Sequence, residues 1–142
     1  MIGGGLLGIE AAYGLVRAGV AVTLVHVMDR LMERQLDAGG ALLLRQALER
    51  RGIRVVLGAQ TRAIRGTSRV AAVELADGEV IACDLVVMAV GVRAETGLAA
   101  SAGLSTGRGI IVDDQMQTSA AGIYALGDCI EHRGRCYGLV EP

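Results

Sequence analysis

The chain has 142 residues, enough for one domain with a sizeable core and too few for two ordinary ones. Its 14 basic residues, all arginines, are balanced by 15 acidic ones, and the net charge of −1 offers no basic surface for nucleic acid or an acidic membrane. Hydrophobic residues make up 52% of the chain but include neither phenylalanine nor tryptophan, and 21 glycines accompany one proline. This composition excludes collagen, coiled coils and disordered tails. A core of small branched side chains suits helices packed on a buried parallel sheet.

The distribution of charges and cysteines excludes a membrane span and argues against secretion. The longest stretch without a charged residue, Gln115–Gly127, falls well short of the roughly 20 residues that a spanning helix needs. The N-terminal segment has no basic region and reaches Glu10 early, unlike a signal peptide. The three cysteines form no CxxC pair, and their odd number argues against a disulfide framework. We therefore expect a cytoplasmic protein with no metal site in this chain.

The first segment predicts a strand, a glycine-rich turn, a helix and a second strand. Ile2 is followed by the glycine-rich run Gly3–Gly8, and an apolar helical pattern then continues to Val16. Gly19 predicts the end of that helix, and Val20–Val25 predicts a short buried strand. The glycines therefore lie at the turn of a β-α-β unit.

The middle of the chain predicts a second helix and then an antiparallel sheet. A helix is expected over Asp37–Arg51, with Leu43, Leu44, Ala47 and Leu48 on its apolar side, and a strand over Ile53–Leu57. Three short alternating strands should follow, at Arg62–Arg65, Val70–Leu75 and Glu79–Cys83. The dipeptide Asp77-Gly78 is a strong hairpin signal between the last two.

The remaining segments predict short elements. Leu85–Val90 is a continuous apolar run, which indicates a strand buried on both faces. A helix over Glu95–Ala102 and small strands at Ile110–Val112 and Ile123–Ala125 should follow, and a new apolar element begins at Tyr137–Val140. Only two residues precede the first glycine, where such folds usually have a strand of four to six. We therefore expect the chain to be a piece of a longer protein.

The spacing Gly3-x-Gly5-x-x-Gly8 fits the dinucleotide fingerprint, and each glycine has a physical role. The first glycine allows the tight turn, the second lets the backbone approach a pyrophosphate, and the third lets the helix lie close to the strands. The free N–H groups of Leu6 and Leu7 at the helix start would favour a phosphate. The alternative is a glycine-rich turn without a ligand.

His26 occupies the place where the fingerprint expects an acidic residue for the ribose diol. A neutral histidine could bond a ribose hydroxyl group, and together with Arg30 and Arg34 it could accept a 2′-phosphate. The alternative is a half-exposed histidine at a strand end that contacts nothing. The choice between NADH and NADPH therefore stays open.

Three motifs together resemble the FAD- and NAD(P)H-dependent pyridine nucleotide-disulfide oxidoreductases. They are Gly3–Glu10, Leu85–Gly91 and Thr118–Asp128, and they occur in the order found in that family. Two further stretches, Val25–Asp37 and Glu131–Gly134, resemble the branch that contains the large subunit of NAD(P)H nitrite reductase. The resemblance covers nearly the whole chain.

The resemblance implies roles for four further residues. Gly91 matches the glycine after the strand beneath the nicotinamide nucleotide, and Glu10 matches an acid near the nicotinamide. Gly127 and Asp128 match the second FAD motif, whose aspartate bonds the ribityl chain of the flavin. The alternatives are an ordinary first-turn helix acid for Glu10 and a turn acid at a strand end for Asp128.

The expected fold is α/β: a Rossmann-like NAD(P)-binding domain over residues 1–106 with a parallel sheet and a three-stranded antiparallel crossover, and part of an FAD-binding domain over residues 107–142. No residue is assigned a catalytic role. The residues expected to contact NAD(P)H or FAD are Gly3, Gly5, Leu6, Leu7, Gly8, Glu10, His26, Arg34, Gly91, Gly127 and Asp128.

The resemblance implies an oxidoreductase that transfers hydride from NAD(P)H to FAD and electrons onward to an acceptor, which the nitrite reductase branch suggests is nitrite. Its partners would be NAD(P)H, the other half of the FAD domain and a second copy in a homodimer. Iron–sulfur and sirohaem groups would belong to it only as an intact nitrite reductase. Two alternatives remain, a non-catalytic NAD(P)H-sensing module and an inactive truncated product, and the chain alone is expected to be inactive.

Overall fold

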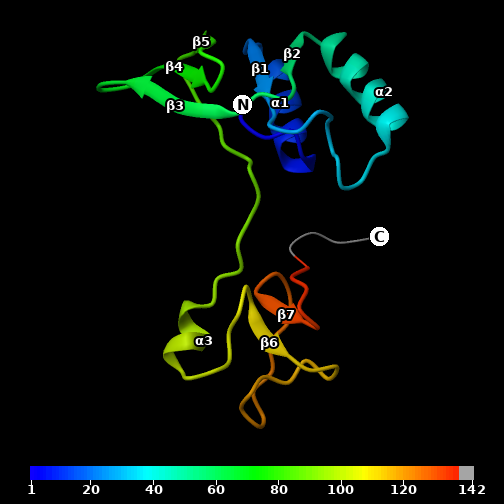
Figure 1. Ribbon diagram of the computed structural model, residues 1–142, viewed down its shortest axis with the longest axis vertical. Helices are drawn as coiled ribbons and strands as arrows, with labels where there is room; N and C mark the ends of the chain where they lie inside the picture. The colour runs from blue at the N-terminus through cyan, green and yellow to red at the C-terminus, as the bar shows by residue number, and fades with distance from the viewer. Residues whose placement is uncertain (138–142) are drawn as a thin grey trace. The chain divides into compact units, whose positions relative to one another are not determined.

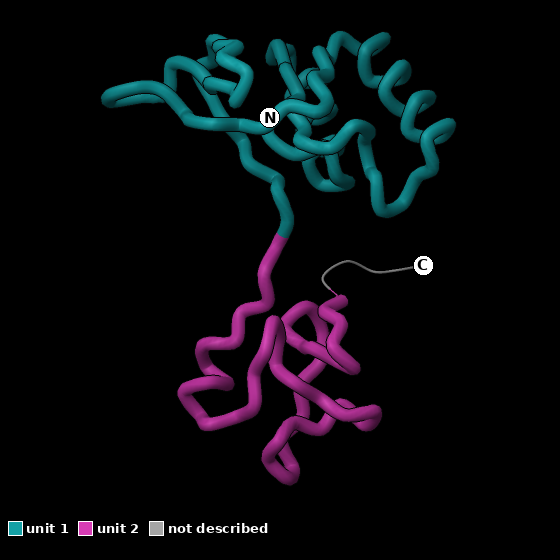
Figure 2. Tube along the Cα trace, viewed as in Figure 1, with its two compact units in different colours: residues 1–91 teal, residues 92–142 magenta. Residues whose placement is uncertain are grey.

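The computed structural model describes residues 1–137, which form two compact units, residues 1–91 and residues from 92 onward (Figure 2). The sequence places a functional boundary later, after residue 106, and that assignment stays a prediction. Most of the expected apolar element at Tyr137–Val140 lies outside the described residues. None of the helices in the described part of the chain has the length and apolarity needed to cross a membrane.

Unit 1 is built on a short parallel sheet with two helices on one face (Figure 1). Its elements are α1 (Leu6–Arg17), β1 (Val22–Val25), α2 (Ala38–Glu49) and β2 (Ile53–Val56). The strands β1 and β2 pair in parallel with Val22 opposite Ile53, and Ile2 extends the sheet by bridging Val25 on one side and Met88 on the other. The predicted β-α-β unit with the glycines at its turn is confirmed.

The helices bury their apolar faces against β1 and β2. The largest fully buried side chains of this cluster are Leu24, Leu31 and Ile53, and Ile9 of α1 and Leu48 of α2 pack with them. Burial of such side chains from water is the main favourable contribution to folding.

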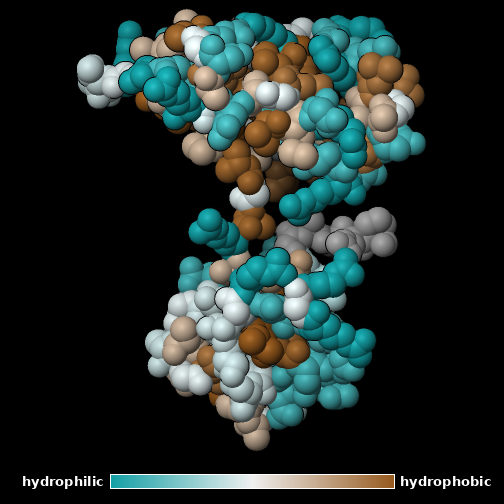
Figure 3. Space-filling model, viewed as in Figure 1, coloured by the Kyte–Doolittle hydropathy of each residue, from teal (hydrophilic) through white to brown (hydrophobic). Residues whose placement is uncertain are grey.

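The helix α2 begins and ends where its flanking residues predict. The Asp37 carboxylate caps its N-terminus by accepting a hydrogen bond of 2.8 Å from the Gly40 N–H group. Beyond its C-terminus, Gly52 adopts a φ of +85°. Only part of its expected apolar side faces the core, because Leu43 is 67% exposed and hydrophobic side chains gather on the outside over α2 (Figure 3).

A three-stranded antiparallel sheet covers the other face of the parallel sheet. It consists of β3 (Thr61–Gly66), β4 (Val70–Leu75) and β5 (Val80–Ala82) in the order β3-β4-β5. Val73 and Leu75 of β4 pack with Ile2 and Val25 into a second buried cluster. The predicted hairpin is confirmed, since Gly78 turns the chain with a φ of +94° between β4 and β5.

The prediction that Leu85–Val90 forms a strand buried on both faces is wrong for this chain. The segment makes one isolated bridge, between Met88 and Ile2, and the Met88 side chain is 60% exposed. Two hydrogen bonds of 2.8 Å, from Ile2 to Val87 and from Ala89 to Ile2, make up this pairing. Pairing of this segment is therefore limited to Ile2 within residues 1–137.

Unit 2 contains a short helix, α3 (Gly97–Ser101), and two short strands, β6 (Ile110–Val112) and β7 (Ile130–His132), which pair in parallel. The strand expected at Ile123–Ala125 is reduced to a single bridge between Tyr124 and Gln117. The strand β7, which pairs with β6, was not predicted from the sequence.

Candidate dinucleotide-binding site

Two of the fingerprint glycines are required by the packing of the chain itself. Gly3 has a φ of +112°, and a Cβ atom there would collide with the carbonyl oxygen of Ala89. A Cβ atom on Gly8, at the start of α1, would collide with the carbonyl oxygen of Gly3. These glycines therefore let the turn, the helix and the segment at Ala89 approach one another closely.

Gly5 differs from both, because nothing in the described chain requires a glycine there. Its φ of −82° is open to any residue, and a Cβ atom built on it would have no other atom within 4 Å. The space beside Gly5 at the start of α1 is therefore open. The approach of a pyrophosphate to Gly5, which the fingerprint expects, stays a prediction that this open space allows.

The N-terminus of α1 presents hydrogen-bond donors toward this open space. Gly5 is the N-cap, no side chain caps the helix, and no acidic residue lies in its first turn. The first bond within the helix runs from the Ile9 N–H group to the Gly5 carbonyl group over 3.0 Å, so the N–H groups of Leu6 and Leu7 have no partner in the described chain. Free N–H groups and the helix dipole together favour an anion here.

His26 follows β1 directly and is buried, with 8% of its surface exposed. The Gly4 N–H group donates to its Nδ1 atom over 3.0 Å, and its Nε2 atom lies 3.1 Å from the carboxylate of Glu33. Because Nδ1 accepts a hydrogen bond, the neutral ring carries its proton on Nε2 and donates it to Glu33. The alternative of a half-exposed histidine without contacts is therefore wrong, and a ribose hydroxyl group would have to replace one of these two partners.

Four charged residues follow His26 in the segment 27–34 after β1: Asp29, Arg30, Glu33 and Arg34. Partial burial raises the pKa of the Glu33 carboxyl group, but hydrogen bonds from its own backbone and from His26 outweigh burial and hold the pKa below its ordinary value. The Arg34 side chain is exposed. Arg30 lies 3.7 Å from the carboxylate of Asp29, in a solvent-exposed pair that contributes little to stability.

Glu10 lies in the second turn of α1 and is exposed. The alternative of a first-turn acid that favours the helix dipole is wrong, because α1 begins at Leu6 and the effect fades beyond the first turn. Glu10 instead lines a groove between α1 and α2, where Arg51 lies 5.6 Å from the centre of the Tyr13 ring. Its expected place near a nicotinamide stays a prediction.

The other residues predicted to contact cofactors are Gly91, Gly127 and Asp128, which lie outside the helices and strands. Gly91 ends unit 1 with a φ of +109°, and Gly127 adopts a φ of +87°. Asp128, which follows Gly127 in a turn before β7, is exposed and has no hydrogen-bond or ion-pair partner among residues 1–137. The carboxylate of Asp128 is therefore free to accept a hydrogen bond from a ligand.

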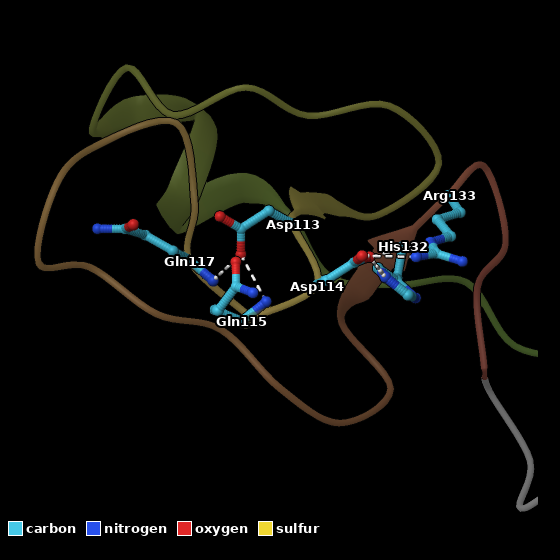
Figure 4. A network of polar contacts seen from close by, with 6 residues as sticks. All are labelled: Asp113, Asp114, Gln115, Gln117, His132 and Arg133. Carbon is cyan, nitrogen blue, oxygen red and sulfur yellow. Dashed lines mark hydrogen bonds and ion pairs between the residues drawn. The ribbon is translucent and has the colours of Figure 1, made fainter.

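Thr118, the first residue of the predicted flavin motif, has a structural role. It is buried, and its hydroxyl group donates to the Ile123 carbonyl oxygen over 3.0 Å. The carboxylate of Asp113 holds the same loop by accepting hydrogen bonds of 2.9 Å from the N–H groups of Gln115 and Gln117 (Figure 4). These contacts hold the loop between β6 and the turn that contains Asp128.

An ionic cluster in unit 2 was missed by the sequence analysis. The Asp114 carboxylate accepts a hydrogen bond of 2.8 Å from His132, and Arg133 donates to both of its oxygens, over 2.9 and 2.5 Å (Figure 4). Hydrogen bonds from the Arg133 guanidinium group and, to a lesser extent, from His132 lower the pKa of Asp114 to about 2. No sequence spacing indicates this cluster, because parallel pairing of β6 with β7 brings its members together.

The glycine-rich turn presents free N–H groups at the start of α1, and Ile2 just before it pairs in parallel with Val25 and Met88. This arrangement is typical of dinucleotide-binding α/β proteins. The sequence profile of the pyridine nucleotide-disulphide oxidoreductases matches residues 1–139, and the chain belongs to that family. Its members are FAD-dependent and use NAD(P)H. The resemblance stated for the three motifs is thereby confirmed.

The relatives agree with this family. The chain is 52% identical to the nitrite reductase (NAD(P)H) of Bacillus subtilis (strain 168) and 46% identical to the assimilatory nitrate reductase electron transfer subunit of the same strain. Each match covers 100% of this chain but 18% of the relative. A crystal structure of a ferredoxin reductase from Rhodopseudomonas palustris superposes with a TM-score of 0.87 at 38% identity, over 92% of this chain and 33% of the other. The chain thus spans less than two fifths of the length of these proteins.

Proposed function

We propose that this chain is the NAD(P)H-binding portion, with part of the flavin-binding portion, of an oxidoreductase that passes hydride from NAD(P)H to FAD. In this proposal residues 1–106 bind the dinucleotide and residues 107–142 contribute to the flavin site. The observation that carries it is Gly5, whose missing side chain leaves open space next to the free N–H groups of α1 and serves no contact inside the chain.

The dinucleotide would be held mainly by backbone groups. The N–H groups of Leu6 and Leu7 would donate to the pyrophosphate, while Gly3 and Gly8 keep the turn close to the sheet. Arg34, exposed after β1, would lie toward the adenosine ribose and attract a 2′-phosphate. The role of the protein in such a reaction is to position and orient the cofactor, and the flavin supplies the electron chemistry when bound.

Asp128 supports the flavin part of the proposal. Its carboxylate is exposed and unpaired within residues 1–137, in the turn before β7. A ribityl hydroxyl group is a suitable donor for such an acceptor. Gly127, with its φ of +87°, allows the turn that presents this carboxylate.

We further propose nitrite as the final acceptor of the whole protein. The support is the 52% identity to a nitrite reductase from Bacillus subtilis. Iron–sulfur and sirohaem groups would then belong to the whole enzyme and not to this chain. The chain could also act as an NAD(P)H-binding module without catalysis, which is favoured by the presence of the complete glycine-rich turn within unit 1 alone.

The test is a titration of the purified chain with NADH and NADPH, followed by nicotinamide fluorescence and calorimetry. The proposal expects weak but saturable binding of at least one of the two, and competition by the matching oxidised dinucleotide. No binding of either nucleotide at millimolar concentration would overturn it. Because the chain alone is expected to be inactive, reduction of bound FAD by NADH or NADPH is measured in the whole protein, where reduction supports the oxidoreductase and its absence supports the non-catalytic module.

A further inference from the structure

Gly4 is the one residue of the glycine-rich turn whose backbone is bonded on both sides to the segment after β1. Its N–H group donates to His26 over 3.0 Å, and its carbonyl group accepts from the Met32 N–H group over 3.0 Å. A Cβ atom on Gly4 would lie 2.7 Å from both the His26 ring and the Leu31 side chain. The turn and the segment 26–33 are therefore packed without a gap.

The contact between Gly4 and His26 decides which backbone donors of the turn remain free. Because the Gly4 N–H group points to the buried Nδ1 atom of His26, it cannot point toward a bound anion. The donors left for a ligand are the unbonded N–H groups at the start of α1, among them those of Leu6 and Leu7. The peptide between Gly3 and Gly4 thus keeps one orientation as long as His26 offers an unprotonated Nδ1 atom.

Glu33 fixes the ring that accepts this hydrogen bond. Its carboxylate lies 3.1 Å from Nε2, so it selects the tautomer with the proton on Nε2 and leaves Nδ1 as an acceptor. The opposite tautomer would place a proton on Nδ1 facing the Gly4 N–H group, and the ring would lose both partners. Met32, with a φ of +49°, bends the chain so that Glu33 reaches the ring.

We propose that His26 and Glu33 are positioning residues for the dinucleotide: they hold Gly4 so that the turn is already shaped for the pyrophosphate, and the His26 ring does not itself contact the ribose. This inference rests on the proposed dinucleotide binding. It gives the histidine at the end of β1 a function other than the ribose contact expected from the fingerprint. Preorganised backbone donors bind an anion more tightly than donors that must first be ordered.

The experiment combines one measurement on the unchanged chain with three variants. In the wild-type chain, long-range nitrogen–proton NMR spectra should show His26 as the neutral Nε2–H tautomer and a Gly4 amide proton shifted strongly downfield. Glu33→Ala should weaken binding of NADH or NADPH about five- to tenfold, the loss expected for one hydrogen bond, and shift the Gly4 amide signal. Glu33→Gln keeps an acceptor for Nε2–H and should recover most of the affinity.

The control is Glu49→Ala, which removes an exposed glutamate that is likewise hydrogen-bonded, to Arg45 over 2.8 Å, but lies at the far end of α2. Its affinity and Gly4 signal should match those of the wild type. Unchanged affinity of Glu33→Ala, or an Nδ1–H tautomer in the wild-type chain, would overturn the positioning role while leaving dinucleotide binding intact. A wild-type chain that binds neither nucleotide would instead overturn the proposed function together with this inference.

Discussion

The backbone of Gly3 lies so close to Gly8 that a single Cβ atom on Gly8 would overlap the Gly3 carbonyl oxygen. The turn and the first residues of α1 are therefore in direct backbone contact. Gly5, between them in sequence, has no such neighbour. Two glycines of the motif are therefore required by the packing of the chain, whereas Gly5 is not, and its proposed role toward a ligand can be tested separately.

Replacing Gly5 by valine should abolish dinucleotide binding and leave the fold intact. The valine side chain would fill the space in which the pyrophosphate approaches, whereas the backbone at φ −82° accommodates it. The loss of glycine at an N-cap should cost about 1 kcal/mol of stability. Calorimetric titration and circular dichroism measure the two effects, and unchanged binding by the variant would place the ligand elsewhere.

Replacing Gly8 by alanine should destabilise the chain by about 2 kcal/mol or more, because the new methyl group overlaps backbone atoms that cannot move aside easily. The matched control is Gly14→Ala in the same helix, where a Cβ atom would have open space. That variant should be more stable than the wild type by about 0.5–1 kcal/mol, since alanine favours a helix interior. Urea denaturation measures both, and equal effects of the two substitutions would contradict the packing described for Gly8.

Arg34→Ala should weaken binding of NADPH relative to NADH. If the exposed guanidinium group reaches the 2′-phosphate, its loss removes one solvent-exposed charge interaction, worth about 1 kcal/mol or roughly fivefold in affinity. Arg17→Ala, at the opposite end of α1, is the control and should change neither affinity. If the ratio of NADPH to NADH affinity is the same in the wild type and in Arg34→Ala, Arg34 does not contact the 2′-phosphate.

The stability of unit 2 should depend on pH through Asp114. Its pKa in the folded state is about 2, below the value of about 4 for an unperturbed aspartate, because Arg133 and His132 stabilise the charged form. The resulting stabilisation is fully present above about pH 4 and is lost as the pH falls toward 2. Denaturation of the wild type and of Asp114→Asn between pH 6 and pH 2 should therefore converge at the acidic end. A constant difference between the two curves would exclude this linkage.

The purified chain should carry no flavin. Gly127 and Asp128 are exposed, and a single free carboxylate is too little to hold a cofactor whose surface is normally buried for the most part. Visible absorbance of the purified protein measures bound flavin directly. One equivalent of FAD retained through gel filtration would show that this chain encloses the cofactor by itself.

Most helices, turns and strands of unit 1 can be predicted from residues close together in sequence. The glycine spacing, the apolar period of α1 and the Asp77-Gly78 hairpin each depend on residues close together in the chain, and the structure confirms all three. The family also followed from short motifs, since the glycines occur at a fixed spacing between a strand and a helix.

Contacts between residues far apart in sequence could not be predicted and became visible in the folded chain. His26 bonds Gly4 across 22 positions, and Asp114 meets His132 only because β6 and β7 pair in parallel. Met88 is 60% exposed although its segment is apolar, and Ile2 is its one bridge partner within residues 1–137, so apolar composition alone does not predict burial. Spacing along the chain predicts a turn or a helix, but hydrogen bonding and burial across a sheet are set by which strands become neighbours.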